Sequence, residues 1–204
     1  MIFDKNHVFL DSFFMMSTLK QHIRNRLSGS LPGEAAHFRM APEHMEAELK
    51  AVDMSQVTPK QSAVLILLFE QDDELYVVFI RRSDYVGIHA GQIAFAGGRY
   101  EESDGDLQTT ALREVEEEIG ISAEKIEILG VLSDLYVPPS NFMVRPFVGY
   151  LHQKPVYTTD TREVKSVHEI ALSTLMDEAI IREKTFTAHG TRSEIRARYY
   201  HAGD

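Results

Sequence analysis

The sequence predicts an α/β protein in which helices cover both faces of a β-sheet, a helix–sheet–helix sandwich. Two observations favour this class: short apolar, strand-like runs recur after Pro59, and single helices with apolar faces stand before and between them. The 204 residues, 44% hydrophobic and 25% charged, suffice for one well-packed domain. We therefore divide the chain into an N-terminal helical extension over residues 1–58, which packs on or flanks the rest, and a sheet-bearing domain over residues 59–204.

The extension is predicted to contain two helices, at residues 16–27 and 42–52, joined by a glycine- and proline-containing loop at 28–41. Leu19, Ile23 and Leu27 repeat every four residues, as residues on one face of a helix do. Pro42 stands where the first turn of a helix tolerates proline. Met16 begins a segment typical of a natural start, so we expect the residues before it to be an extension ahead of the protein proper.

Strands and turns alternate in the domain. The strand-like segments are residues 63–69, 75–80, 93–95, 125–132, 143–151 and 164–170, with a terminal hairpin at 184–188 and 194–200. A polar turn at residues 71–74 makes a hairpin of the first two strands, and residues 138–141 separate the fourth from the fifth. A short helix is expected at residues 173–179. Residues 83–98 are predicted to be a glycine-punctuated loop around the short third strand.

One long helix is predicted over residues 106–119, because an aspartate can cap its start and Gly120 can end it. On this helix, Glu114, Glu117 and Glu118 stand at positions i, i+3 and i+4, so they share one face. Like charges on one helix face repel by a few tenths of a kcal/mol per pair. Three carboxylates together are therefore locally unfavourable unless a cation joins them.

Two interpretations of this acidic face stay open. Hard divalent cations such as Mg²⁺ prefer oxygen ligands, so the three carboxylates are candidates for a metal site. The alternative is a solvated acidic face, which is the commoner meaning of a glutamate run. Gly97 and Gly98 favour the metal site, because glycine ahead of the helix lets the backbone approach a ligand or a metal. Arg113, four residues before Glu117, is expected to hold a carboxylate in orientation.

The composition excludes several kinds of protein and site. The chain has no cysteine, so it holds no disulfide, no cysteine-ligated zinc or iron–sulfur site and no thiolate nucleophile. A formal net charge of −10 argues against a general nucleic-acid binder or a binder of anionic membranes. The longest apolar run, residues 63–69, is far shorter than the roughly 20 residues that span a bilayer. The first residues do not read as a secretory signal, so we expect a cytoplasmic protein.

The stretch from Gly98 to Ile121 carries the most specific pattern in the chain. Residues 113–121 read Arg-Glu-Val-Glu-Glu-Glu-Ile-Gly-Ile, and Gly98 and Asp104 precede them. This pattern resembles the Nudix box of the Nudix hydrolases, with two departures: Asp104 stands in place of a glutamate, and one extra residue separates it from Arg113. The resemblance implies a Nudix-type α/β/α sandwich with a mixed β-sheet, and hydrolysis of a nucleoside diphosphate that is linked to another group.

A second motif stands upstream and resembles the one that accompanies the box in the coenzyme A pyrophosphatase branch. The matching positions are Arg82, Ser83, His89, Gly91, Gln92, Phe95, Gly97 and Gly98. Gly87 and Ala96 depart, because the branch has arginine and proline there. The resemblance covers residues 62–175 and implies coenzyme A or its acyl thioesters as substrate, cleaved to 3′,5′-ADP and (acyl-)4′-phosphopantetheine. It also leads us to expect a further helix after Asp204.

The resemblance implies a role for each matching residue. It implies a Mg²⁺ or Mn²⁺ cofactor, whose ligands are Glu114, Glu117, Glu118 and the Gly98 carbonyl. Arg113 would orient a carboxylate, either Glu117 or Asp104, and the general base would be Glu117 or Glu163. The implied substrate contacts are Arg82, Ser83, His89, Gln92 and Phe95. The partner would be a small-molecule diphosphate, with no nucleic acid and no membrane, and the sequence leaves a homodimer open.

Other functions stay open beside this one. The same chemistry on nucleotide sugars, dinucleotides or nucleoside triphosphates is favoured by the departures at Gly87 and Ala96. A catalytically silent Nudix module that binds a nucleotide belongs to another class, and the complete set of carboxylates argues against it. An acidic protein-interaction domain would leave the glycine and Arg-Ser motifs unexplained.

Overall fold

The computed structural model describes residues 17–42, 45–84, 90–187 and 194–202. Within them the main sheet has eight strands: β1 (Lys60–Gln71), β2 (Glu74–Arg82), β3 (Ile93–Ala94), β4 (Ala96–Arg99), β5 (Glu127–Val131), β6 (Leu135–Val137), β7 (Phe142–Leu151) and β8 (Val164–Ala171). The order along the main path is β3-β2-β1-β7-β5; β4 pairs with β1, β6 with β7, and β8 with β2. Strands β1 and β7 run parallel and the other pairs antiparallel. The sheet is therefore mixed, as expected.

The central strands bury both of their faces. Alternate side chains of β1 point to opposite faces, so Ala63, Leu65 and Leu67 pack in one core with the apolar face of helix α4 (Leu107–Ile119). Leu68 packs in a second core on the other face, together with residues of β5 and β7. Two cores on opposite faces of one sheet require a cover on each side.

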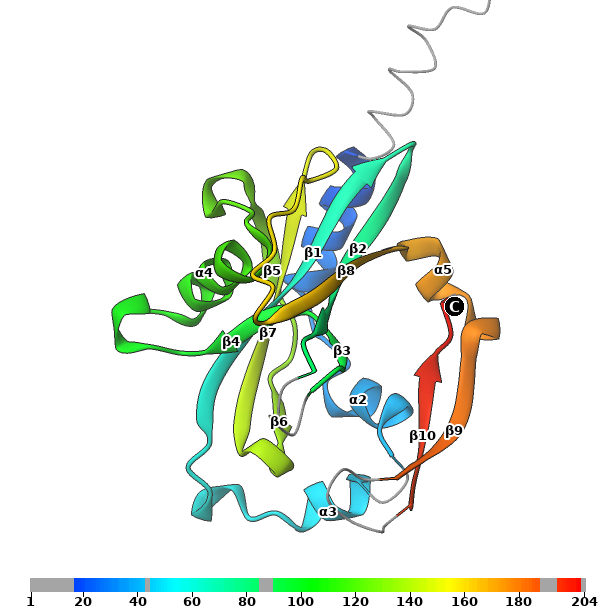
Figure 1. Cartoon of the computed structure of the whole chain (residues 1–204). Helices are drawn as coiled ribbons and strands as arrows, with labels where there is room; N and C mark the ends of the chain where they lie inside the picture. The colour runs from blue at the N-terminus through cyan, green and yellow to red at the C-terminus, as the bar shows by residue number, and fades with distance from the viewer. Residues whose placement is uncertain (1–16, 43–44, 85–89, 188–193, 203–204) are drawn as a thin grey trace, which may run out of the picture.

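Helices supply both covers, which confirms the predicted sandwich (Figure 1). Helix α4 lies on one face, and the helical segment over residues 17–27 lies on the other, where Ile23 and Leu27 contact the second core. Glu127 of β5 fixes this segment by ion pairs with Lys20, at 3.0 Å, and with Arg24. The N-terminal segment is thus the third layer of the sandwich.

Local signals explain the bounds of α4. The Asp106 carboxylate accepts a hydrogen bond of 2.7 Å from the Thr109 N–H and caps the first turn. Gly120 ends the helix in the left-handed conformation, with a φ of 74°. Both residues stand where the sequence places the ends of the helix. Among the helices of the described part of the chain, none is long and apolar enough to cross a membrane.

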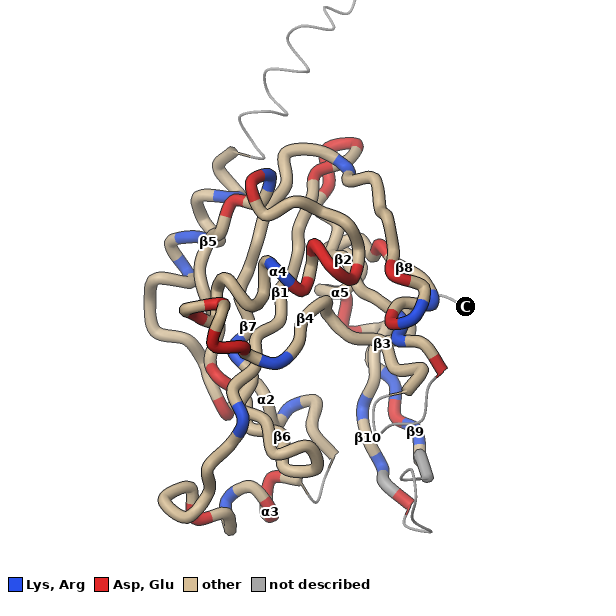
Figure 2. Tube along the Cα trace, turned by 60° about the vertical axis from the view of Figure 1, so that its left-hand side comes forward, with Lys and Arg blue, Asp and Glu red and all other residues tan. Residues whose placement is uncertain are grey.

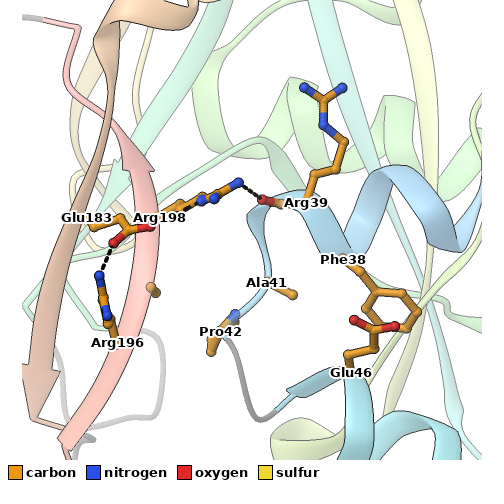
Figure 3. A pocket seen from close by; sticks show the side chains of 9 residues that line it. Phe38, Arg39, Ala41, Pro42, Glu46, Glu183, Arg196 and Arg198 are labelled. Carbon is orange, nitrogen blue, oxygen red and sulfur yellow. Dashed lines mark hydrogen bonds and ion pairs between the residues drawn. The ribbon is translucent and has the colours of Figure 1, made fainter.

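A separate two-stranded hairpin, β9 (Ile181–Thr187) with β10 (Glu194–Tyr200), stands beside the main sheet and next to α2 (Glu34–Met40) (Figure 1). Strand β10 is as predicted, whereas β9 begins three residues before the strand predicted at residues 184–188, and the turn between the two lies outside the described residues. Figure 3 shows the contact between the hairpin and α2, where Arg198 of β10 donates a hydrogen bond of 3.3 Å to the Arg39 carbonyl. Within the hairpin, Glu183 of β9 forms an ion pair with Arg196 of β10. Residues of α2 and of the hairpin line the pocket that Figure 3 draws, and the exposed charges around it pair with one another in part.

Four sequence predictions differ from the structure. The loop predicted at residues 28–41 is wrong in its second half, because α2 forms there behind Gly33, which takes a positive φ of 54°. The second helix begins later than predicted, as α3 (Met45–Ala51). The short strand at residues 93–95 is two strands, β3 and β4, and β6 was not predicted at all. The helix expected at residues 173–179 is α5 (Leu172–Met176), followed by a 3₁₀ turn.

Candidate active site

The predicted carboxylates lie on one face of α4, but in different environments. The Glu118 side chain is 2% exposed, Glu114 is 14% exposed and Glu117 is 59% exposed. Acidic and basic positions lie close together around this helix (Figure 2). The burial of two like charges beside each other is costly unless other groups compensate them. The neighbouring residues provide that compensation.

Arg113 balances the negative charges of two of these carboxylates, Glu114 and Glu117, and that of Asp104. Its Nη1 atom lies 3.0 Å from an oxygen of Glu114 and 3.0 Å from an oxygen of Glu117. Its Nε and Nη2 atoms hold the two oxygens of Asp104 at 2.8 and 3.1 Å, and Nη2 also donates to the Arg99 carbonyl. Both partners proposed for Arg113 from the sequence, Glu117 and Asp104, are therefore in contact with it.

Glu118 is held from two sides. Its Oε2 atom accepts a hydrogen bond of 2.9 Å from the Gly97 N–H, and its Oε1 atom lies 3.4 Å from Arg82 Nη1. Burial raises the pKa of Glu118 to about 7, although Gly97 and Arg82 both favour its charged form. Burial also raises the pKa of Glu114, against the opposing effect of Arg113. A desolvated carboxylate pair of this kind gains free energy from an additional positive charge.

The two glycines of β4 allow the carboxylates to approach the sheet. A Cβ atom at Gly98 would lie 2.3 Å from the Oε1 atom of Glu114, inside any allowed contact distance. Gly97 has a φ of 157°, and a Cβ atom there would lie 2.4 Å from the Ala63 carbonyl oxygen. The fold requires glycine at position 97, where a Cβ atom would meet the backbone of β1, whereas Gly98 leaves room for the Glu114 carboxylate.

Glu163 reaches the same place from a different part of the chain. Its charge lies near enough to raise the pKa of both Glu114 and Glu118. The loop before it is fixed at the C-terminal end of α4, where the Asp160 N–H donates to the Glu118 carbonyl at 3.1 Å. Ser83 fixes the other side, because its N–H donates to the Glu163 carbonyl at 2.8 Å and its hydroxyl donates to the Thr161 carbonyl at 3.2 Å.

A cleft of about 410 Å³ opens on the sheet face opposite to α4. It is lined by residues of the glycine segment, of β1 and of the β6–β7 region: Ser62, Val64, Arg82, Gln92, Ala94, Phe95, Gly97, Gly98, Arg99, Val137, Ser140, Phe142 and Val144. Gly97 and Gly98 line the cleft while their other side meets the carboxylates of α4. The cleft and the acidic face therefore meet along these two glycines.

The cleft gathers several of the residues predicted to contact substrate. Arg82, Gln92 and Phe95 line it, whereas the Ser83 side chain contacts the loop of Glu163. His89 and the variant position Gly87 lie outside the described residues.

The cleft also has walls that sequence reasoning missed. The apolar β6–β7 wall was missed because its residues look like ordinary core residues, and only the parallel pairing of β7 with β1 brings them to the cleft. Arg145 of β7 forms a two-point ion pair with Asp134.

The donor set has the chemistry that a hard divalent cation requires. Its atoms are carboxylate oxygens on one helix face, and burial raises the pKa values of Glu114 and Glu118 in spite of the neighbouring arginines. In the described part of the chain, no three acidic or histidine side chains already converge to hold a metal ion. Arg113 occupies Glu114 and Glu117 instead, so coordination requires these two side chains to turn from the arginine.

Comparison with known proteins agrees with this arrangement. The chain is 32% identical over 149 residues to Nudix hydrolase 22, chloroplastic, of Arabidopsis thaliana, covering 72% of this chain and 49% of that protein. It is 30% identical over 136 residues to the peroxisomal coenzyme A diphosphatase NUDT7 of Mus musculus, covering 67% and 57%. The chain thus spans about half the length of the curated relatives it matches.

A solved structure and a family model complete the comparison. An Ap4A hydrolase of C. elegans is similar with a TM-score of 0.48 and 16% identity, covering 57% of this chain and 83% of that one. The NUDIX domain model matches residues 59–189, which include the acidic helix, both glycines and Glu163. The chain belongs to the Nudix hydrolase family.

Proposed function

We propose that the protein hydrolyses the diphosphate bond of a nucleoside diphosphate linked to another group, with coenzyme A or an acyl-coenzyme A as its substrate and a divalent cation as cofactor. The observation that carries this proposal is the meeting of the carboxylates of α4 with the cleft at Gly97 and Gly98. A diphosphate at this edge is within reach of the acidic face of α4. It is also within reach of Arg82, which lies beside Glu118 and lines the cleft.

Glu114, Glu117, Glu118 and the Gly98 carbonyl are the proposed cation ligands. A bound Mg²⁺ or Mn²⁺ would neutralise the diphosphate and lower the pKa of the attacking water. The protein supplies the oxygen donors and, through Arg113, sets their orientation while no cation holds them. Arg82 holds Glu118 in its buried place and presents a cation to the cleft.

Glu163 is the proposed general base, with Glu117 as the alternative. Glu163 lies beside the acidic face on a loop that is hydrogen-bonded on both sides, and this fixed placement suits a group that must accept a proton from water. Glu117 is exposed and tied to Arg113, which suits a ligand more than a base. Arg82, Gln92 and Phe95 are proposed to contact the substrate.

Coenzyme A is preferred as substrate on two grounds. The motif from Arg82 to Gly98 matches the coenzyme A pyrophosphatase branch at eight positions, and the mouse relative is named a coenzyme A diphosphatase. Nucleotide sugars, dinucleotides and nucleoside triphosphates are the second candidates, because Gly87 and Ala96 depart from that motif. Ala96 is buried and pairs with Leu65 in the sheet, so this departure changes a strand residue beside the cleft.

A substrate panel tests the proposal. Coenzyme A, acetyl-coenzyme A, ADP-ribose, UDP-glucose, NADH, diadenosine polyphosphate and GTP are each incubated with Mg²⁺ and with Mn²⁺, and the products are identified by mass spectrometry. We expect 4′-phosphopantetheine and 3′,5′-ADP from coenzyme A at the highest rate. Preferential cleavage of another compound would make that compound the substrate in place of coenzyme A. Cleavage of none would favour a catalytically silent module that binds a nucleotide.

A further inference from the structure

One cation in the cleft has no role in the site as described so far. Arg99 follows Gly98 on β4, is exposed, and lines the cleft. Its carbonyl accepts a hydrogen bond from Arg113, whereas its guanidinium makes no ion pair with any residue that the structure describes. Arg82, the other arginine of the cleft, is paired with the buried Glu118. Arg99 is therefore the cleft arginine whose charge the surrounding acids do not balance.

The strand register decides which way Arg99 faces. Gly98 pairs with Ala63, which packs in the core under α4, and the Cβ direction of Gly98 leads to the carboxylate of Glu114. Arg99 is the next residue of the strand, so its side chain points to the opposite face. It pairs there with Ser62, on the side of the sheet where the cleft lies.

Arg99 thus stands at the end of a row across the cleft floor. Ser62 pairs with Arg99 on one side and with Val144 of the parallel strand β7 on the other. Val64 and Phe142 line the same cleft, so the floor next to the guanidinium is apolar. A ligand that fits here combines a flat or apolar group with an anion at its edge, because the guanidinium binds phosphate and carboxylate oxygens in pairs.

The bond to be broken must lie on the other side of the glycines, beside the carboxylates of α4, and this step rests on the proposed function. The anion at Arg99 therefore belongs to the part of the substrate that fills the cleft. A cleft of about 410 Å³ has room for one nucleoside and its phosphates.

We propose that Arg99 binds a phosphate of the substrate nucleotide other than the two joined by the cleaved bond, and so selects a nucleoside that carries an additional phosphate on its ribose. In coenzyme A this group is the 3′-phosphate. Nucleotide sugars and common dinucleotides lack it, so Arg99 discriminates between the two substrate classes that the sequence leaves open.

Binding titrations test the role of Arg99 without requiring turnover. Adenosine 3′,5′-bisphosphate and adenosine 5′-monophosphate are titrated calorimetrically into the wild type, Arg99→Ala, Arg99→Lys and Arg182→Ala. Arg182 lies on β9, outside the cleft, and serves as the matched arginine control. We expect the wild type and Arg182→Ala to prefer the bisphosphate at least about tenfold, as a charge-assisted hydrogen bond implies. Arg99→Ala should lose this preference and Arg99→Lys should keep part of it.

An equal preference for the bisphosphate in wild type and Arg99→Ala would overturn the proposal, and so would the absence of any preference in the wild type.

Turnover assays separate the role of Arg99 from the proposed function. Arg99→Ala should raise the KM for coenzyme A at least about tenfold and leave the KM for dephospho-coenzyme A unchanged. An equal rise for both compounds would place Arg99 on the diphosphate and overturn the proposal. Failure of the wild type to hydrolyse either compound would overturn the proposed function, while the titrations decide the role of Arg99.

Discussion

Arg113 and Asp104 form a two-point ion pair that joins α4 to the turn before it, with Nε 2.8 Å from Oδ1 and Nη2 3.1 Å from Oδ2. Asp104 also accepts hydrogen bonds from the Glu101 N–H and the Thr110 hydroxyl. Its side chain is one methylene shorter than the glutamate of the Nudix pattern, and it stands one residue farther from the arginine. The additional residue and the shorter side chain compensate each other, so the departure keeps the ion pair.

Replacement of Asp104 by asparagine should destabilise the protein by about 2–3 kcal/mol at neutral pH, because Arg113 loses its charged partner. The hydrogen bonds from Arg113 hold the pKa of Asp104 well below its ordinary value of 3.8. The ionised Asp104 therefore stabilises the fold above about pH 4, and this contribution disappears as the pH falls below that value. Urea unfolding of the wild type and Asp104→Asn should show a difference in unfolding free energy that shrinks between about pH 5 and about pH 2. A difference that stays constant with pH would contradict the ion-pair explanation.

Replacement of Glu117 by glutamine should lower kcat at least about 100-fold while the protein keeps its fold. Glu117 is exposed, so its removal costs little packing, but the proposed cation loses an oxygen ligand. Circular dichroism and turnover of the preferred substrate measure the two effects. Glu116→Gln is the matched control, because Glu116 is exposed and points away from the other three glutamates. Comparable turnover by Glu117→Gln and the control would show that the acidic helix does not hold the cation.

The two glycines of β4 should respond differently to alanine. At Gly98 the new Cβ atom meets the mobile end of the Glu114 side chain, so Gly98→Ala should fold but lose activity as the carboxylate moves. At Gly97 it meets the backbone of β1 at a φ of 157°, so Gly97→Ala should lose at least about 2 kcal/mol of stability. Thermal unfolding and activity assays of both variants check this contrast. Equal loss of stability in both would contradict it.

Removal of divalent cations should abolish turnover reversibly. Excess EDTA withdraws the proposed cation from Glu114 and Glu118, whereas the fold is held by two cores of hydrophobic side chains. Turnover after chelation, and again after excess Mg²⁺ or Mn²⁺ is added back, provides the measurement. Full activity in EDTA would exclude the proposed cofactor.

The sequence predicts the fold where local signals and burial agree. Asp106 and Gly120 define α4, and the apolar run that becomes β1 predicts a central strand. Helix α2 was missed because it has only seven residues and no buried side chain, so tertiary contacts with the hairpin decide it. Strand β4 was missed because its glycines read as loop, and its pairing with β1 cannot be inferred from local sequence.

The candidate site follows the same division. The spacing of the glutamates on α4 is a local property, and it predicts their shared face. The contact of Arg113 with Glu117 follows from their i, i+4 spacing, whereas its simultaneous pairing with Asp104 depends on the turn before α4. The role of Ser83 as an anchor of the Glu163 loop depends on two chain segments that meet only in the folded protein.

The parallel pairing of β1 with β7 has a consequence for biosynthesis. The hydroxyl of Ser62 bonds to the carbonyl of Met143, 81 residues farther along the chain. Neither the cleft floor nor the β7 edge of β1 can be completed before β7 has left the ribosome, so a nascent chain that ends at α4 leaves that edge of β1 unpaired. The protein therefore completes its binding surface late, in one long-range closure.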